Sequence, residues 1–372
     1  MITYWLWLIN LKGIGPVTIR KLVDRLGSPM AVYQASIEEL QNIKGLKLGQ
    51  IETLLSQHSL ESAQRIEDYM QRNGINLLTY DDPYFPPYIN EFPGLPAILY
   101  YRGKLRTLTS SIGIVGSRRC TAYGKEVTAD AAAFLGHAGM TVVSGMAKGI
   151  DSYAHTACLK AGGYTLALVA NGVDICYPPE HQMLMEEIVE SGAVISSYPP
   201  GTRPRQEYFP ERNKLLAAWV EKLLVVEAAD RSGALITAEY AMWFKHRVYA
   251  VPNSIYSPES LGTNRLLLHG AEVYLGPDQL LKKCKKEDSN NSLLKKPQKS
   301  KALKKQRQNR CDSNKLQEQV ILDRLDQVQD INDLLDVCNG DISGLIELLC
   351  RMELEGKVSI LGQKVKRLSE VE

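Results

Sequence analysis

Short apolar runs alternate with amphipathic segments along the middle of the chain. Seven runs rich in Val, Ile, Leu and Ala lie at 112–115, 141–144, 165–170, 193–196, 222–227, 248–251 and 272–275. Runs of this length indicate strands buried on both faces of a parallel sheet, and the segments between them have the apolar spacing of amphipathic helices. The alternation therefore predicts an α/β fold with a Rossmann-like, doubly wound and mostly parallel sheet.

Helical patterns precede this sheet. The apolar segment 4–11 runs into a glycine turn without a basic leader, so we interpret it as a helix and not as a signal peptide. The turns at 11–16 (LKGIGP) and 43–46 (IKGL) lie between helical patterns and resemble tandem helix-hairpin-helix elements. Such turns can bind nucleic-acid phosphates through their N–H groups, or they simply connect packed helices. The basic residues nearby are Lys12, Arg20, Lys21, Lys44 and Lys47.

A proline-rich segment joins this helical part to the sheet. Residues 74–105 contain Pro83, Pro86, Pro87, Pro93 and Pro96, with Tyr and Phe between them. Proline fixes the backbone in an extended conformation and is tolerated at sheet edges. The segment therefore predicts an extended strap, in which 97–101 enters or edges the main sheet.

Two glycine-rich turns follow neighbouring predicted strands. Residues 113–119 (GIVGSRR) and 144–151 (SGMAKGID) each precede a helical pattern, so both open at the carboxyl edge of the sheet. Small residues let backbone N–H groups approach an anion, and Arg118 and Lys148 add full positive charges. The pattern predicts a phosphate-bearing ligand. Neither turn has the G-x-G-x-x-G spacing and the chain holds no P-loop motif, which disfavours an ordinary NAD or ATP site.

Three further segments follow strands of the same sheet. They are 171–178 (NGVDICYP), 208–214 (YFPERNK) and 232–238 (SGALITA). We expect Arg212, Asn213 and Lys214 to begin a helix, where cations oppose the helix dipole and need an external anion or an internal carboxylate such as Asp174. Ser232 and Gly233 open the next helix, where they either bind phosphate or cap the helix.

Composition is that of a cytosolic protein with several domains. The chain has 372 residues, of which 44% are hydrophobic and 23% charged, and no apolar stretch is long enough to span a membrane. Seven Cys include no C-x-x-C pair, and six His show no metal-ligand spacing. We therefore expect a cytoplasmic protein with reduced thiols and with neither metal nor cofactor.

The net charge of +2 conceals an asymmetry. Residues 282–310 hold twelve Lys or Arg against two acids, a net +10, whereas 311–372 hold seven against thirteen, a net −6. Such a basic segment with little apolar content predicts a disordered linker, which either serves as a spacer or adds nonspecific phosphate affinity.

The tail has the order of elements found in winged helices. Helical patterns at 316–325, 331–337 and 343–354 precede two short strands that turn at 361–363. The expected recognition helix carries Glu347, Arg351 and Glu353, in a module of net charge −6. A helix that binds in a DNA groove needs an electropositive face. We therefore favour a module that contacts protein or regulates this chain over a module that recognises DNA.

The ordered motifs resemble those of the DNA-processing protein A (DprA, or Smf) family. They are G-S-R, S-G-M-A-x-G-I-D, G-x-D-x-x-Y-P, F-P-x-R-N-[RK], S-G-x-L-x-T-A and G-T-N-x-L-x-x-G-A. The resemblance covers nearly the whole chain. It implies a protein without catalytic activity that binds and protects single-stranded DNA entering by natural transformation and helps to load the RecA recombinase. It also implies a homodimer formed through the Rossmann-like domain.

The resemblance carries a set of DNA-binding residues onto this sequence. They are Gly116, Ser117, Arg118, Ser144, Gly145, Lys148, Gly149, Asp151, Phe209, Arg212, Asn213, Lys214, Ser232 and Gly233. We expect Arg118 to clamp a phosphate while Arg119 points elsewhere. We expect Asp151 to cap its helix and hold its loop. Phe209 stacks on a base if its ring is exposed, whereas charge alone carries DNA binding if the ring is buried behind the loop.

Four parts follow along the chain. We expect a helix-hairpin-helix or SAM-like domain at 1–72, the strap and Rossmann-like DNA-binding domain at 73–281, the basic linker at 282–314 and a winged-helix-like domain at 315–372.

Two enzyme classes compete with this interpretation. Phosphoribohydrolases of the cytokinin-activating type share a similar sheet, but their P-G-G-x-G-T-x-x-E motif is absent, and Glu239 is expected to face solvent or to pair with a cation. A nucleotide-cofactor oxidoreductase would need the missing dinucleotide fingerprint.

Overall fold

The computed structural model describes two compact units, Met1–Lys283 and Cys284–Glu372. In the first it describes 1–281 except 87, 88, 90, 91, 93, 108 and 109, and in the second 319–325, 329–338, 345, 348, 349, 352, 357–361 and 364–367. The predicted basic linker at 282–314 lies outside these residues.

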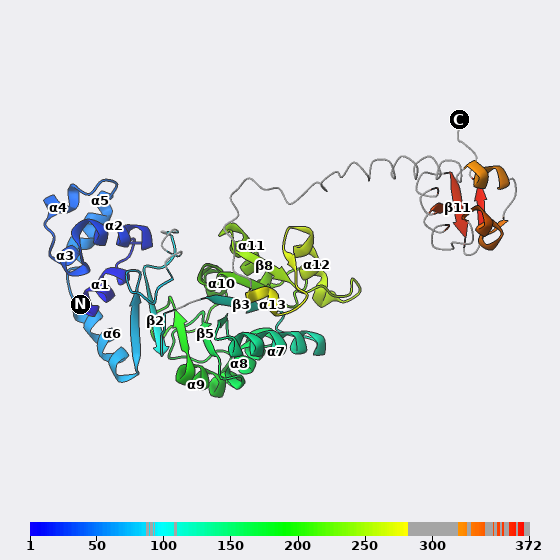
Figure 1. Ribbon diagram of the computed structural model, residues 1–372. Helices are drawn as coiled ribbons and strands as arrows, with labels where there is room; N and C mark the ends of the chain where they lie inside the picture. The colour runs from blue at the N-terminus through cyan, green and yellow to red at the C-terminus, as the bar shows by residue number, and fades with distance from the viewer. Residues whose placement is uncertain are drawn as a thin grey trace, which may run out of the picture. The chain divides into compact units, whose positions relative to one another are not determined.

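The first unit is built on a mixed sheet. Among the described residues it has nine strands in the order β1-β2-β6-β5-β4-β3-β7-β8-β9 (Figure 1). Strands β3 to β9 run parallel, and β2 and β1 add antiparallel pairs beside β6. The strands are β1 (Ile75–Thr79), β2 (Ile98–Gly103), β3 (Ser111–Val115), β4 (Thr141–Ser144), β5 (Tyr164–Leu168), β6 (Ala193–Ser196), β7 (Lys222–Val225), β8 (Arg247–Ala250) and β9 (Glu272–Val273). The predicted doubly wound, mostly parallel sheet is confirmed.

The predicted strands all form, with ends that move by at most two residues. The strap segment enters the sheet as β2. The edge strand β1 was missed, because its burial alternates along a short stretch that contains Asn76, and such a pattern is weak beside that of the fully buried strands.

Helices cover both faces of the sheet (Figure 1). One face packs against α7 (Ala122–His137), α8 (Ile150–Lys160) and α9 (Gln182–Ser191), and the other against α10 (Tyr208–Trp219), α11 (Gly233–Trp243) and α12 (Leu261–Leu268). Small side chains such as Ala131 and Ala132 let α7 lie close to α8. Within the described stretches, no helix is long and apolar enough to cross a membrane.

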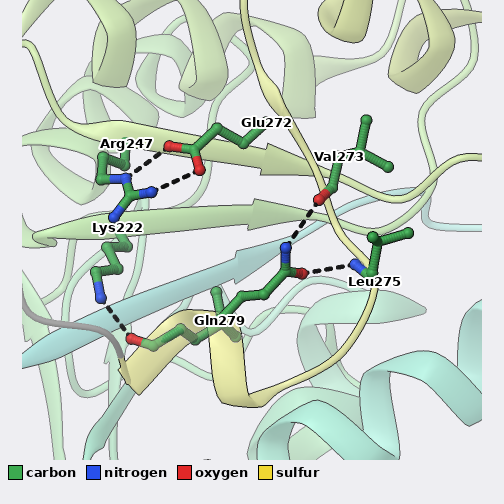
Figure 2. Close-up of polar contacts among 7 residues, drawn as sticks. Lys222, Arg247, Glu272, Val273, Leu275 and Gln279 are labelled. Atoms are coloured by element: carbon green, nitrogen blue, oxygen red, sulfur yellow. Dashed lines mark hydrogen bonds and ion pairs between the residues drawn. The ribbon is translucent and has the colours of Figure 1, made fainter. Parts of the chain in front are cut away.

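A polar clasp fixes the end of this unit to the sheet (Figure 2). Arg247, the first residue of β8, donates two hydrogen bonds of 2.6 Å to Glu272 of β9. The buried Lys222, the first residue of β7, donates to the carbonyl of Leu280 in α13 (Asp278–Leu281) at 2.6 Å. The Gln279 side chain accepts a hydrogen bond from the N–H of Leu275 and donates one to the carbonyl of Val273 in β9. The unit therefore ends at the amino edge of the sheet, opposite the glycine-rich loops.

The N-terminal part is helical. Its helices are α1 (Ile2–Asn10), α2 (Pro16–Leu26), α3 (Pro29–Gln34), α4 (Ile37–Gln41), α5 (Leu48–Ser56) and α6 (Glu61–Arg72). Gly13 and Gly45 have φ values of 82° and 80°, so the two turns repeat one left-handed conformation that favours glycine. Gln50 donates to the carbonyl of Gly13 at 3.2 Å and thereby joins the two hairpins.

The second unit contains the three-stranded antiparallel sheet β10-β12-β11, made of β10 (Gln329–Asp330), β12 (Lys364–Arg367) and β11 (Val358–Leu361). Residues 319–324 are helical, and Ile331–Cys338 forms a 3-10 helix where an α-helical pattern was predicted. Helical residues Leu345, Leu348, Leu349 and Met352 are buried in the core of this unit. Glu347, Arg351 and Glu353 lie outside the described residues.

Candidate nucleic-acid interface

A crevice opens at the topological switch point of the sheet, between β3 and β7. The parallel neighbours β3 and β7 are followed by helices on opposite faces, α7 and α11, so their loops diverge at the carboxyl edge. The crevice has a volume of about 760 Å³ and is lined by residues from 115–119, 147–151, 206–216 and 229–237, together with Tyr177 and Glu259. The glycine-rich loops thus meet at one edge, as the sequence predicts.

The loop after β3 presents Arg118 to the crevice. A Cβ on Gly116 would lie 2.7 Å from Cγ1 of Ile150, so close packing requires glycine there. The Ser117 hydroxyl accepts from the Arg119 N–H at 3.1 Å and shapes the turn. Arg118 is exposed, and among the described residues it has no ion-pair partner. Its guanidinium carbon lies 5.3 Å from the ring centroid of Phe209.

Arg119 also lines the crevice, so the expectation that it points elsewhere is wrong. The two arginines differ in depth. Arg118 also lines a small inner pocket of about 60 Å³ together with Phe209, whereas Arg119 lines the outer crevice alone.

The loop after β4 packs directly on the first loop. Gly149 has a φ of +78°, and a Cβ there would lie 2.3 Å from the carbonyl oxygen of Ser117. Asp151 accepts from the N–H groups of Gly145 at 3.1 Å and Ala147 at 3.4 Å, so it holds the loop as expected. It does not cap α8, because the residue at the N-cap is Gly149.

Two other predicted residues of this loop have internal partners. The buried Ser144 hydroxyl donates to the carbonyl of Ile114 at 2.6 Å, which directs it into the sheet. Lys148 lines the inner pocket, and its ammonium group forms an ion pair with the exposed Glu180. That pairing lowers the pKa of Glu180.

Arg212 lines the crevice and the inner pocket, but its guanidinium is bound by the protein itself. Helix α10 begins at Tyr208, so Arg212 lies past the first turn and not at the helix start as predicted. Its side chain is buried, and its guanidinium donates to the carbonyls of Gly145 at 2.5 Å and Leu168 at 2.6 Å. Burial lowers the pKa of Arg212, and the nearby Asp151 carboxylate opposes that shift. The internal carboxylate beside Arg212 is therefore Asp151.

Asp174, the partner suggested by the sequence, is engaged elsewhere. Its carboxylate accepts from the Gly201 N–H and from the hydroxyl of Tyr69, each at 2.9 Å. Tyr69 lies on α6, so Asp174 joins the N-terminal helices to the loops at the sheet edge. Of the two alternatives for Arg212, the internal carboxylate is therefore not Asp174.

The remaining predicted residues bridge α10 and α11. Asn213 accepts from Arg212 Nε at 3.0 Å and donates to the carbonyl of Gly233 at 3.1 Å. Ser232 is the N-cap of α11 and accepts from the Ala234 N–H, so it caps the helix. The ammonium of Lys214 lies 5.9 Å from the ring centroid of Tyr240, and Lys214 is not among the residues that line the crevice.

An aromatic pair forms one wall of the crevice. Phe209 is half-buried and Tyr177 is 39% exposed, with their ring centroids 5.9 Å apart. Tyr177 was not predicted as a site residue, although it lies in the G-x-D-x-x-Y-P motif. The exposed Arg231 was also missed, because it precedes the S-G-x-L motif and no pattern marked it.

Comparisons with known proteins agree with this architecture. A family model described as DNA recombination-mediator protein A matches residues 76–285, and a SAM-like helix-hairpin-helix tandem model matches residues 7–57. Protein Smf of Synechocystis is 38% identical over 284 residues, which cover 75% of this chain and 71% of that protein. DNA processing protein DprA of Bacillus subtilis is 34% identical over 205 residues, which cover 55% and 69%.

Solved structures give the same match. An X-ray structure of DNA processing protein A from Streptococcus pneumoniae aligns with a TM-score of 0.64 and 29% identity, covering 76% of this chain and 97% of that one. The Helicobacter pylori protein, described for its single-stranded DNA binding mode, aligns with a TM-score of 0.51 and 27% identity, covering 55% and 93%.

Proposed function

Because the chain belongs to the DNA recombination-mediator protein A family, we propose that it binds single-stranded DNA in the crevice between β3 and β7. One observation carries the proposal: Arg118, which is exposed and has no ion-pair partner within the described part of the chain, lies beside the Phe209 and Tyr177 rings at the sheet edge where such folds bind ligands. A cation beside aromatic faces suits a strand that offers a phosphate and an unstacked base together. The single-stranded DNA binding mode described for the Helicobacter pylori relative also supports it.

The residues of the crevice divide into two roles. Arg118, Arg119 and Arg231 are exposed at the crevice and can meet phosphates. The backbone of the glycine-rich loops fixes the register of the strand, held in shape by the Asp151 and Arg212 pair underneath. Asn213 and Ser232 hold the helix ends in place. Lys148 binds a phosphate of the strand when that phosphate displaces Glu180 from the ion pair.

Single strands fit this site better than duplexes do. The bases of a duplex are stacked and paired in its interior, so they cannot reach the Tyr177 and Phe209 rings. A single strand exposes both its phosphates and its base faces, and it can enter a confined crevice.

We assign the protein to DNA processing during natural transformation, in the cytoplasm. The finer steps are protection of incoming strands, loading of RecA onto them and action as a homodimer. These steps rest on the motif resemblance to DNA-processing protein A, and we propose them on that basis. In this proposal the protein binds DNA and catalyses no reaction.

Hydrolysis of a nucleotide is the alternative function. Glu239, the carboxylate that a phosphoribohydrolase would need, is exposed on α11 and does not line the crevice. No geometric feature of the described residues therefore favours that reaction.

A fluorescence-anisotropy titration tests the proposal. The purified full chain is titrated against a labelled single strand, the matching duplex and AMP, each across a salt series. We expect tighter binding of the single strand at about 0.15 M salt, where nonspecific attraction is partly screened. Equal affinity for both DNA forms, or cleavage of AMP, would overturn it.

A further inference from the structure

A fully buried carboxylate lies beneath the arginine loop. Glu227 follows β7, and its side chain accepts from the N–H of Thr121 at 2.9 Å and from the Thr121 hydroxyl at 2.5 Å. Thr121 is the N-cap of α7 and follows Arg118 by three residues. The backbone of Glu227 also packs closely against that loop, since its carbonyl oxygen would lie 2.9 Å from a Cβ on Gly116.

The carboxylate occupies the start of a long helix. Helix α7 has 16 residues and no acidic residue in its own first turn, so Glu227 supplies a negative charge from another strand. A Cβ on Gly124 would lie 2.5 Å from the Glu227 carboxylate, and glycine is therefore what allows so close an approach. In doubly wound folds the helix after the first strand commonly receives a phosphate in this way, with glycine admitting it.

We propose that Glu227 is a resident anion that fills the phosphate position at the start of α7 and closes it to free phosphates. Glu227 is thus a specificity-determining residue, because it disfavours the nucleotide cofactors that the fold would otherwise accept at this helix. If the proposed function holds, the nucleic acid is thereby confined to the outer crevice.

The neighbouring thiol of Cys120 offers a way to test for the charge on Glu227. Burial and the negative charge of Glu227 together raise the pKa of Cys120. Cys120 is half-buried and precedes the helix cap, so its reactivity reports on the charge at this position.

Anion rescue provides the first test. Glu227→Ala removes the carboxylate, and Glu227→Gln keeps the volume without the charge. Melting temperatures are measured in sodium formate, inorganic phosphate and sodium chloride of equal ionic strength. We expect formate and phosphate to raise the melting temperature of Glu227→Ala by about 3 °C or more beyond their effect on the wild type and on Glu227→Gln. An equal effect on all three proteins would overturn the proposal.

A second measurement tests the charge on Glu227 if Glu227→Ala does not fold. The alkylation rate of Cys120 is followed against pH by mass spectrometry in the wild type and in Glu227→Gln. We expect the pKa of Cys120 to be lower in Glu227→Gln, because a neutral amide no longer opposes the thiolate. An unchanged profile would mean that Glu227 carries no charge, and the proposal would fail.

Failure of this inference differs from failure of the proposed function. Wild-type binding of oligothymidylate tests the crevice, whereas anion rescue of Glu227→Ala tests the position beneath it.

Discussion

Arg118→Ala is predicted to weaken single-strand binding far more than Arg119→Ala. The residues are adjacent and identical, both are exposed, and both line the crevice. Of the two, Arg118 alone reaches the inner pocket and lies over the Phe209 ring, at 5.3 Å from its centroid. A phosphate bound there would meet a guanidinium oriented beside an aromatic face, whereas Arg119 would supply charge without a fixed geometry.

The magnitude depends on how well each guanidinium is positioned against a phosphate. Removing a charge-assisted hydrogen bond to phosphate costs roughly 1.5 to 3 kcal/mol, which is about 10- to 150-fold in the dissociation constant. A poorly positioned surface charge is worth about 0.2 to 1 kcal/mol, at most about fivefold. The log-log salt slope should become shallower by about 0.7 when the protein neutralises one single-strand phosphate fewer.

Anisotropy titrations with oligothymidylate over a salt series measure both quantities. Arg118→Lys serves as the matched variant, because it keeps the charge without the bidentate geometry, and it should fall between the wild type and Arg118→Ala. Thermal melts by circular dichroism should be the same for all variants, since Arg118 is exposed. If Arg118→Ala and Arg119→Ala weaken binding equally, the crevice is a diffuse cationic surface and the residue assignments are wrong.

Three further predictions follow from the charges of the molecule. Lys-to-Gln changes confined to 295–305 should weaken low-salt binding of single strands and duplexes about equally and flatten the salt slope in titrations; an unchanged slope would make the segment a spacer. Glu180→Gln releases Lys148 from its ion pair and should tighten single-strand binding about two- to fivefold, as measured by anisotropy; no change would exclude Lys148 from the interface. Burial lowers the pKa of His155 from its ordinary 6.5 to about 3. Between pH 6.5 and 3 the unfolded chain therefore binds a proton at His155 that the folded protein does not bind, and the free energy of unfolding falls as the pH decreases. Between pH 7 and 5 the decrease in stability from His155 should be about 2 kcal/mol. Denaturant unfolding should show it in the wild type and in a variant of the exposed His269, but not in His155→Gln.

Local apolar patterns were enough to predict the architecture. Buried strands such as Thr141–Ser144 and Ala193–Ser196 are short runs rich in Val, Ile and Ala, and parallel strands must open their loops at one edge. That rule places the loops that carry Arg118, Gly145 and Phe209 at the same edge of the sheet.

The functions of individual polar groups depend on contacts that no local pattern contains. Arg212 looked like a phosphate ligand, but Asp151, 61 residues earlier, and the carbonyl of Leu168 make it part of the scaffold. Glu227 ends an apolar run in the sequence, and its role became visible only when the fold placed it against Thr121. Long-range partners of this kind cannot be inferred from residue spacing in one chain.

Photochemical crosslinking of oligothymidylate tests the central claim most directly, because thymine reacts at zero length with the aromatic ring on which it stacks. The full chain is irradiated with the strand bound, and adducts are located by mass spectrometry. We predict adducts on Tyr177 or Phe209 that disappear with Arg118→Ala. Trp243 and Tyr256 are 62% and 90% exposed and are therefore available as competing targets. Adducts on those residues, with none on Tyr177 or Phe209, would contradict the assignment of the crevice as the site of strand binding.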